Sequence, residues 1–274
     1  MYTGTYKLGI NLMGGTGLSV DDHVAMLKRI GWDGFFTGWE RNLLSEYEAA
    51  AEKYGMIWQS IHAPFHQVRY MWNEGELGEQ VTAELIECVG DCAAHNVPVM
   101  VIHPFIGFED HDPTEAGLVN FGKIIEAADT LGVRLGFENV EGEEYLAAIF
   151  EKYAGHPSLG FCLDTGHELC YNRGKDMLAQ YGHALCHTHF NDNIGVTGED
   201  IFWTDDLHLV MGDGIADFSG VMSRIRKTGY DGPLMCELSF ANKPGKNTHD
   251  GYAAMGHEGF YKFALERMKK IVEM

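Results

Sequence analysis

Basic residues are scarce in this sequence. Lys and Arg together number 20 and Asp and Glu number 40 among 274 residues, which gives a formal net charge of −20. Phosphate groups are bound mainly by Lys and Arg, so a surface this acidic repels nucleic acids and anionic membranes. We therefore expect no nucleic-acid partner and no membrane partner.

Long hydrophobic runs are also missing. No segment approaches the roughly 20 apolar residues of a membrane span, and the start MYTGTYKLGI lacks a basic stretch followed by an apolar run. We expect a cytoplasmic protein whose thiols stay reduced. Cysteines number only six, and three of these lie in predicted strands, where a free thiol behaves as a small apolar group. Cys88 and Cys92 are neighbours on one helical face, but no second pair has zinc-ligand spacing.

Prolines number only seven, the 34 glycines are spread through the turns, and no low-complexity linker divides the chain. Hydrophobic residues make up 45% of the sequence, enough for one large core. We expect a single domain over residues 1–274, a length close to the roughly 250 residues typical of a (β/α)₈ barrel.

What is present is a regular alternation of short apolar runs and helical patterns. The predicted strands cover residues 7–12, 34–38, 57–64, 97–104, 134–140, 159–166, 184–192 and 233–240. Strict strand–helix alternation indicates a parallel sheet, and eight repeats favour a closed α/β TIM barrel with eight parallel strands. An open, doubly wound sheet is the alternative, but NLMGGTGLS after the first strand lacks the G-x-G-x-x-G spacing of its phosphate turn.

The carboxyl ends of the last four predicted strands each carry a polar residue: Glu138 in GFENV, Asp164 in FCLDTGH, His189 in CHTHFND and Glu237 in MCELS. In a barrel these ends converge on the face that holds the active site. Carboxylates that point into one cavity repel each other unless a cation lies between them. We therefore expect one divalent metal ion there. Oxygen-rich ligation with one imidazole favours Mn²⁺, with Mg²⁺, Co²⁺ or Zn²⁺ possible.

Side-chain alternation along the strands gives further expectations. His187 and His189 should both face the barrel interior, with Cys186 outside. Glu237 should point inward and Cys236 outward. Five aromatic residues follow strand ends, where they could either cover a sugar ring or pack as core: Trp39, Phe65, Trp72, Phe105 and Trp203.

Several stretches together resemble the xylose-isomerase-like TIM-barrel superfamily, in particular its sugar phosphate isomerase/epimerase group, which is related to endonuclease IV-type abasic-site endonucleases. They are SIHAPF, VIHPF, GFENV, FCLDTGHE, CHTHFNDN, DLHLVMGDGIADF and CELS. The resemblance implies a metal held by Glu138, Asp164, His189 and Glu237, with the two glutamates also acting as catalytic acid and base. It implies substrate contacts by His167 and Glu144, and His62 and His103 at earlier strand ends are further candidates for substrate binding.

Two observations keep the activity open. Several epimerases of the group have an Arg about six residues after the metal-binding His, where this chain has Gly195. The endonuclease branch uses three zinc ions and nine ligands, and equivalents of all nine are present: His62, His103, Glu138, Asp164, His167, His189, Asp206, His208 and Glu237. Asp206 and His208 lie in the stretch 205–218, which is either an ordered connecting loop or part of the site. The acidic net charge argues against a DNA substrate.

The sequence thus predicts an enzyme, a divalent-metal-dependent isomerase or epimerase that acts on a ketose or inosose-like sugar. It would remove a proton next to a carbonyl and pass through a metal-stabilised enediolate. The alternatives are a lyase or dehydratase acting on a keto-sugar, an endonuclease IV-like zinc phosphodiesterase, and a non-catalytic sugar-binding barrel. The identity of the sugar stays open, and a homo-oligomer is possible.

Overall fold

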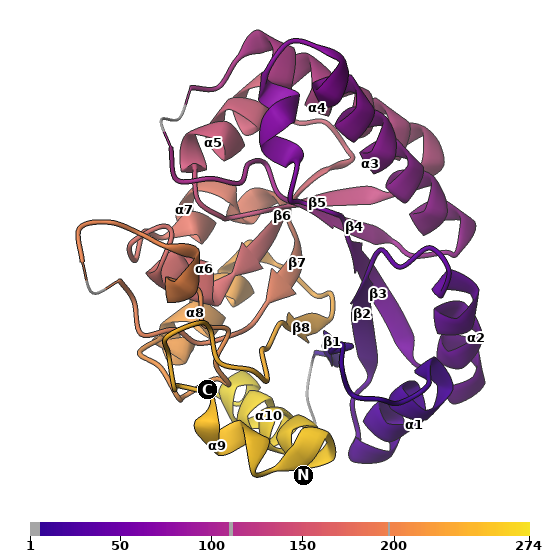
Figure 1. Cartoon of the computed structure of the whole chain (residues 1–274), viewed down its shortest axis with the longest axis vertical. Helices are drawn as coiled ribbons and strands as arrows, with labels where there is room; N and C mark the ends of the chain where they lie inside the picture. The colour runs from indigo at the N-terminus through magenta and orange to yellow at the C-terminus, as the bar shows by residue number, and fades with distance from the viewer. Residues whose placement is uncertain (1–5, 110–111, 197) are drawn as a thin grey trace.

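The computed structural model describes residues 6–109, 112–196 and 198–274. Eight strands, all parallel, form one sheet that curls into a nearly closed barrel, which confirms the predicted fold (Figure 1). The order of neighbouring strands is β7-β6-β5-β4-β3-β2-β1-β8. The strands are β1 (Leu8–Asn11), β2 (Gly34–Gly38), β3 (Ile57–His62), β4 (Val99–Ile102), β5 (Arg134–Glu138), β6 (Leu159–Asp164), β7 (Leu185–His189) and β8 (Leu234–Cys236).

Helices alternate with the strands and surround the barrel (Figure 1). They are α1 (Val20–Ile30), α2 (Leu44–Tyr54), α3 (Glu76–Ala94), α4 (Glu115–Leu131), α5 (Glu143–Lys152), α6 (Thr165–Leu169), α7 (Met177–Tyr181), α8 (Phe218–Thr228), α9 (Asp250–Ala253) and α10 (Gly256–Val272). Short 3₁₀ turns cover Val68–Trp72, Gly182–Ala184 and Trp203–Asp205. The final helix, α10, packs beside α1 and α8 and so joins the two ends of the ring. None of the described helices has the length and hydropathy needed to cross a bilayer.

Local signals fix where the helices begin and end. The Ser19 side chain accepts a hydrogen bond from the Asp22 N–H and so caps α1. Gly31 ends the same helix at φ 111°, a left-handed conformation that favours glycine. Thr114 and Asp217 cap α4 and α8 in the same way as Ser19 caps α1. These caps set the helix lengths that carry the chain back to the start of each next strand.

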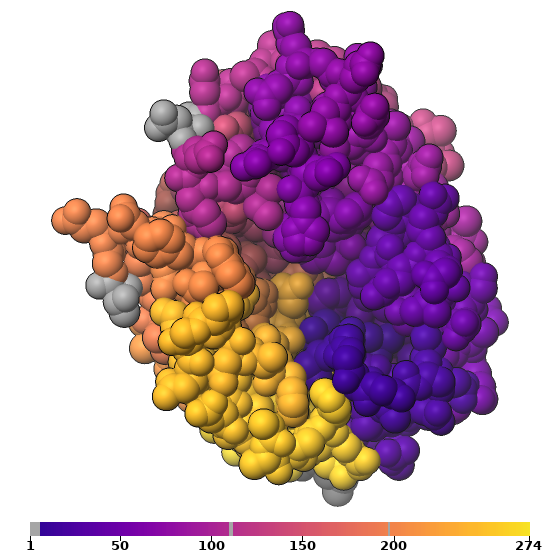
Figure 2. Space-filling view, viewed as in Figure 1, coloured from indigo at the N-terminus to yellow at the C-terminus, as the bar shows by residue number. Residues whose placement is uncertain are grey.

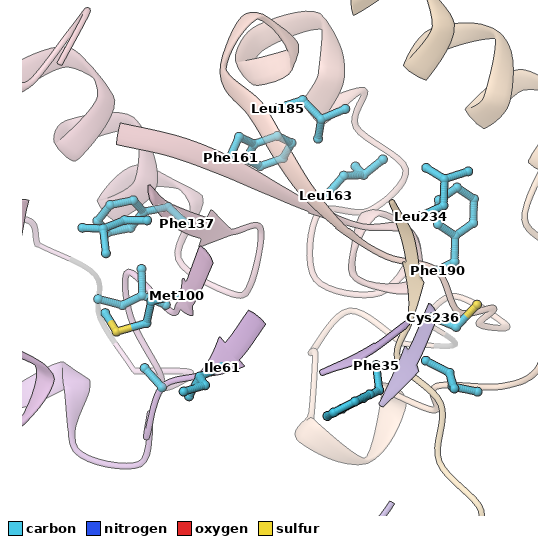
Figure 3. Close-up of a cluster of buried hydrophobic side chains, with 14 of the residues drawn as sticks. Phe35, Ile61, Met100, Phe137, Phe161, Leu163, Leu185, Phe190, Leu234 and Cys236 are labelled. Carbon is cyan, nitrogen blue, oxygen red and sulfur yellow. The ribbon is translucent and has the colours of Figure 1, made fainter. Parts of the chain in front are cut away.

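The main hydrophobic core lies between the sheet and the helices (Figure 3). Phe35, Phe137 and Phe161 are fully buried there, one from each of β2, β5 and β6. Burying one such ring is worth about 2–3 kcal/mol. A second, smaller cluster inside the barrel consists of Val99, Val101 and Cys162, with Cys186 packed against it. We call this inner layer, below the strand ends, the barrel floor.

The barrel closes between β7 and β8 through few contacts. A single parallel bridge joins Phe190 to Cys236, with the Phe190 N–H donating to the Met235 carbonyl at 2.7 Å. One layer below, the hydroxyl of Thr188 accepts a hydrogen bond from the Met235 N–H at 2.9 Å. This seam places the end of β7 beside the end of β8.

The expected orientation of Cys186 is wrong. The pairing of β6 with β7 shifts by one residue, from Phe161↔Leu185 to Cys162↔His187, so Cys186 is the extra residue of a bulge. Its sulfur packs against the inward-facing glycine Gly160 and against the barrel-floor cluster. Strict alternation fails here because a bulge turns two successive side chains to one face. Cys236 lies in the outer core, as expected.

Candidate active site

Four side chains from the ends of four successive strands meet at one mouth of the barrel, as the sequence predicted. Each offers an oxygen or nitrogen atom, and these four atoms all lie within 4.8 Å of one another. Three of the residues are fully buried, and the side chain of the fourth is 20% exposed. They are Glu138, Asp164, His189 and Glu237.

His189 links two of the carboxylates. Its Nδ1 atom lies 2.6 Å from Oε1 of Glu138 and 3.2 Å from Oε2 of Glu237. Its ring stacks on Phe36, with 4.7 Å between the ring centroids. Burial is the largest single influence on the pKa of Glu237 and raises it, but the charge and hydrogen bond of His189 and the charge of His208 together outweigh burial and lower this pKa to about 2.

Asp164 is held by hydrogen bonds to both carboxylate oxygens. The His167 N–H donates to Oδ1 at 2.7 Å, and the Asn191 side-chain amide donates to Oδ2 at 2.6 Å. The Asn139 side chain accepts a hydrogen bond from the Asp164 N–H and donates one to the Asp164 carbonyl. Complete burial raises the pKa of Asp164 to about 6. Such outer contacts fix the direction in which a ligand oxygen points.

His62 and His103 contact the second carboxylate oxygen of Glu138, Oε2, whereas His189 contacts Oε1. The Nε2 atoms of His103 and His62 lie 3.0 Å and 3.4 Å from Oε2 of Glu138. His62 donates its Nδ1 proton to the Ala63 carbonyl at 2.9 Å, so its second ring nitrogen, Nε2, faces Glu138. These three side chains form a second group whose ligand atoms lie close enough for one cation.

A third group contains Asp206 and His208, whose role the sequence left open. His208 Nε2 lies 2.8 Å from Asp206 Oδ2, and His167 Nε2 lies 3.4 Å from Asp206 Oδ1. His208 donates its Nδ1 proton to the Glu237 carbonyl at 3.0 Å. The Asp206 carboxylate raises the pKa of His208 to about 9 against the effect of burial. His208 also has φ 51°, a strained value for a non-glycine residue of the kind that clusters at functional sites.

The donor atoms of these groups fit divalent cations. Within the described part of the chain, two buried ring nitrogens of the site have no hydrogen-bond partner: His103 Nδ1 and His167 Nδ1. Buried polar atoms are nearly always paired in native proteins. In His62 and His208 one ring nitrogen donates to a backbone carbonyl and the other faces a carboxylate, an arrangement that needs either a proton or a cation between the second nitrogen and the carboxylate.

A cavity of about 480 Å³ opens onto the site. Its wall combines the polar groups His62, His103, His167 and Glu237 with aromatic side chains. Phe65 and Trp203 belong to this wall, whereas Trp72 is a core residue whose indole N–H donates to the Pro104 carbonyl. Figure 2 shows one face of the molecule with its centre recessed between the indigo–purple and orange–yellow segments of the chain. The volume lies in the usual range of small-molecule sites.

The Asp192 carboxylate holds the loop that carries Asp206 and His208 against the mouth of the barrel. Its buried carboxylate accepts hydrogen bonds from four backbone N–H groups, at 2.8–3.0 Å: those of Asn193, Gly212, Gly214 and Ala216. The segment 205–218 is therefore an ordered part of the site rather than a simple connection.

The structure places the sequence-predicted residues together with one exception. His62, His103 and His167 line the cavity beside the four central side chains. Glu144 lines a neighbouring pocket instead of the main cavity. Glu141, which the sequence did not single out, lines the main cavity, is 7% exposed, and accepts a hydrogen bond from the Gly107 N–H at 2.9 Å. Its only sequence signal is its position three residues after the end of β5.

Comparison with known proteins agrees with this arrangement. The model of the family described as xylose isomerase-like TIM barrel matches residues 16–256. The chain belongs to this family. A curated relative, an uncharacterised protein of Methanocaldococcus jannaschii, is 25% identical over 198 residues, which are 65% of this chain and 63% of that protein. The chain therefore spans less than two thirds of the length of this relative.

Similar solved structures include two sugar epimerases. The 3-keto-D-glucoside 4-epimerase of E. coli, in its apo form, has a TM-score of 0.70 and 14% identity, with 97% of this chain and 99% of that chain covered. The D-allulose 3-epimerase of Methylomonas sp., solved in complex with D-allulose, has a TM-score of 0.71 and 14% identity, with 98% of both chains covered. At these identities the likeness shows the fold.

Proposed function

We propose that this protein is a divalent-metal-dependent isomerase or epimerase of a keto-sugar. The observation that carries the proposal is the meeting of Glu138, Asp164, His189 and Glu237 within 4.8 Å, beside a cavity of sugar size. Two epimerases with the same fold act on sugars by their names, which supports a carbohydrate substrate. A binding protein without catalysis has no need for two carboxylates that can act as acid and base.

Glu138, Asp164, His189 and Glu237 would hold the metal, with Mn²⁺ as the first candidate because three of the four donors are carboxylates. When bound, a divalent ion supplies a Lewis acid that stabilises negative charge developing on a substrate oxygen. The buried hydrogen bonds to Asp164 keep its two oxygens directed before any substrate arrives.

The two glutamates would move the proton. Glu237 is partly exposed and belongs to the cavity wall, so its carboxylate reaches a bound sugar. It would take or return the proton at the carbon next to the carbonyl. Glu138 would carry out the complementary proton transfer on the opposite face of the sugar. His167, with its Nε2 on Asp206, would orient a substrate hydroxyl. Return of the proton at the same carbon gives epimerisation, return at the neighbouring carbon gives isomerisation, and loss of a β-substituent gives a lyase.

Deuterium uptake from D₂O tests the proposal. Free and phosphorylated ketoses and inososes are incubated with the protein and Mn²⁺, and the carbon next to the carbonyl is followed by NMR. We expect exchange with at least one sugar, its loss in Glu237→Gln, and its retention in Glu151→Gln, which lies beside the opposite ends of β5 and β6. Absence of exchange with every sugar, or full activity of Glu237→Gln, would reject the proposal.

A second candidate is a phosphodiesterase that uses three metal ions. It is favoured by the two further groups, His62–His103–Glu138 and His167–Asp206–His208, which adjoin the first. The net charge of −20 disfavours a DNA substrate. Metal analysis of the purified protein separates the two: about three zinc ions per chain together with cleavage of abasic DNA would support the second candidate, and one or two ions without cleavage would support the first.

A further inference from the structure

We propose that the barrel floor contains a separate site for a thiophilic metal ion, formed by Cys162, His187 and His189. This site lies below the carboxylate group and differs from it in chemistry. It does not depend on the sugar or on the reaction proposed above.

The three side chains converge from two paired strands. Cys162 lies on β6 and pairs in register with His187 on β7, while His189 is two residues further along the same face. All three residues are fully buried. The Cys162 sulfur and one nitrogen of each ring lie within 4.8 Å of one another. One cation with metal–sulfur and metal–nitrogen bonds of about 2.0–2.3 Å bridges such separations after small side-chain adjustments.

Two ring nitrogens, one from His187 and one from His189, have no hydrogen-bond partner outside this group. His187 uses Nε2 to contact the Ser60 hydroxyl at 3.2 Å, and its Nδ1 is unpaired. His189 turns Nδ1 to Glu138, and its Nε2 has no partner other than the Cys162 thiol. Unpaired polar atoms are costly in an interior that also contains Val99 and Val101, so their presence needs an explanation. A metal ion bound between them and the thiol provides it.

The donor set selects the kind of ion. One thiolate and two imidazoles favour Zn²⁺, Co²⁺ or Cu⁺, whereas Mg²⁺ prefers oxygen ligands. Binding replaces the proton of the Cys162 thiol, which leaves to solvent as the metal–sulfur bond forms. The carboxylate group above has no sulfur, so the two groups prefer different ions.

His189 belongs to both groups and couples them. A neutral imidazole has one lone pair and one N–H. His189 therefore offers its lone pair either to the carboxylate group through Nδ1 or to the barrel-floor group through Nε2. When an ion on the floor takes the Nε2 lone pair, the proton moves to Nδ1, which faces Oε1 of Glu138 at 2.6 Å. The floor site and the carboxylate group therefore compete for one side chain.

Cobalt titration of the full-length, metal-free protein tests the proposal, because a sulfur-to-cobalt charge-transfer band reports only a thiolate ligand. We expect the band to reach an intensity that corresponds to one thiolate-bound Co²⁺ per chain, whatever further Co²⁺ the carboxylate group takes up. It should vanish in Cys162→Ser, and His187→Gln should weaken Co²⁺ binding at least tenfold. Cys186→Ser, on the same floor, and Cys236→Ser, in the outer core, are the matched controls that should keep the band.

Three results would overturn the proposal: no band in the wild type, a band that survives in Cys162→Ser, or a band lost in Cys186→Ser instead. Anomalous diffraction from a wild-type crystal with Co²⁺ decides the question should a variant fail to fold. A cobalt peak between Cys162 and His187 supports the site, and its absence there rejects it. No readout involves turnover, so failure of the proposed enzymatic function leaves this result unaffected.

Discussion

The Nδ1 atom of His189 lies 2.6 Å from Oε1 of Glu138, although 51 positions separate the two residues in the sequence. Neither side chain is exposed to solvent. Only the barrel brings them together, since β5 and β7 are not neighbouring strands but both point their last residue into the mouth. The proposed metal site is therefore a property of barrel closure rather than of any local motif.

Gly166→Ala should weaken Mn²⁺ binding by about 10–100-fold, the usual cost of disturbing an outer partner of a metal ligand. An added Cβ would collide with the Asn191 side-chain oxygen, and the Asn191 amide holds Oδ2 of Asp164. Calorimetric titration with Mn²⁺ measures the effect. Asn191→Ala should show a similar loss, and the double variant should be no worse than Asn191→Ala alone. Binding within twofold of the wild type in Gly166→Ala would contradict this prediction.

Glu141→Gln should raise KM for the sugar found by deuterium exchange by about 10–100-fold. Glu141 lines the cavity and is nearly buried, and a hydrogen bond to a charged group contributes roughly 1.5–3 kcal/mol. Glutamine keeps the acceptor that Glu141 offers to Gly107, so the loop should stay in place. Glu144→Gln, on the neighbouring hollow, is the matched control and should change KM less than twofold. The reverse order of effects would restore the role that the sequence assigned to Glu144.

Two glycine-to-alanine substitutions in neighbouring helices should have opposite effects on the free energy of unfolding. A Cβ at Gly117 in α4 would overlap the Trp72 ring, so Gly117→Ala should destabilise by about 1–3 kcal/mol. A Cβ at Gly90 in α3 meets nothing within 4 Å, so Gly90→Ala should stabilise by roughly 0.5–1 kcal/mol. Urea unfolding measures both. Equal effects of the two substitutions would show that the Trp72 contact is unimportant.

Stability should fall in mild acid because of His23. Burial lowers the pKa of this imidazole from 6.5 to about 4, and its Nε2 contacts the Tyr261 hydroxyl at 2.7 Å. Since the unfolded chain binds the proton more readily, the contribution of neutral His23 is complete above pH 6.5 and is lost as the pH falls toward 4. The loss amounts to at most about 1.4 kcal/mol per pH unit.

The comparison with His23→Gln isolates this effect, because the site carboxylates titrate in both proteins. The wild type should lose more stability than the variant between pH 7 and pH 4, by up to about 3 kcal/mol. Urea unfolding at several pH values measures the difference. Parallel pH profiles for the two proteins would show that His23 is not the group responsible.

The barrel and the meeting of its four central side chains could be predicted because the same local pattern repeats eight times and implies the closed fold that brings the strand ends together. Apolar strands that each end in a polar residue fix the topology and the face on which those residues meet. The orientation of Cys186 was missed because a bulge between β6 and β7 leaves no composition signal. Glu144 was expected at the cavity because spacing alone does not determine how the loop after β5 turns, and that turn brings Glu141 there instead.

The role of Asp206 and His208 depended on a long-range interaction. Asp192 lies directly after β7 and fastens the loop through backbone N–H groups at positions 193, 212, 214 and 216. Backbone N–H groups are the same in every residue except proline, so the sequence gives no sign of which ones a carboxylate will select. Only the folded chain shows that the segment returns over the mouth.

Thr188 stands at the seam between β7 and β8, where its hydroxyl takes the place of a main-chain acceptor for Met235. His189 follows Thr188 on β7, and Glu237 lies two residues after Met235 at the end of β8. The Nδ1 atom of His189 and Oε2 of Glu237 are 3.2 Å apart. The separation of these two proposed metal ligands therefore depends on Thr188, a residue that belongs to none of the candidate ligand groups. Under the proposed function, a substitution at position 188 would change the preference for the metal ion without changing any of its proposed ligands.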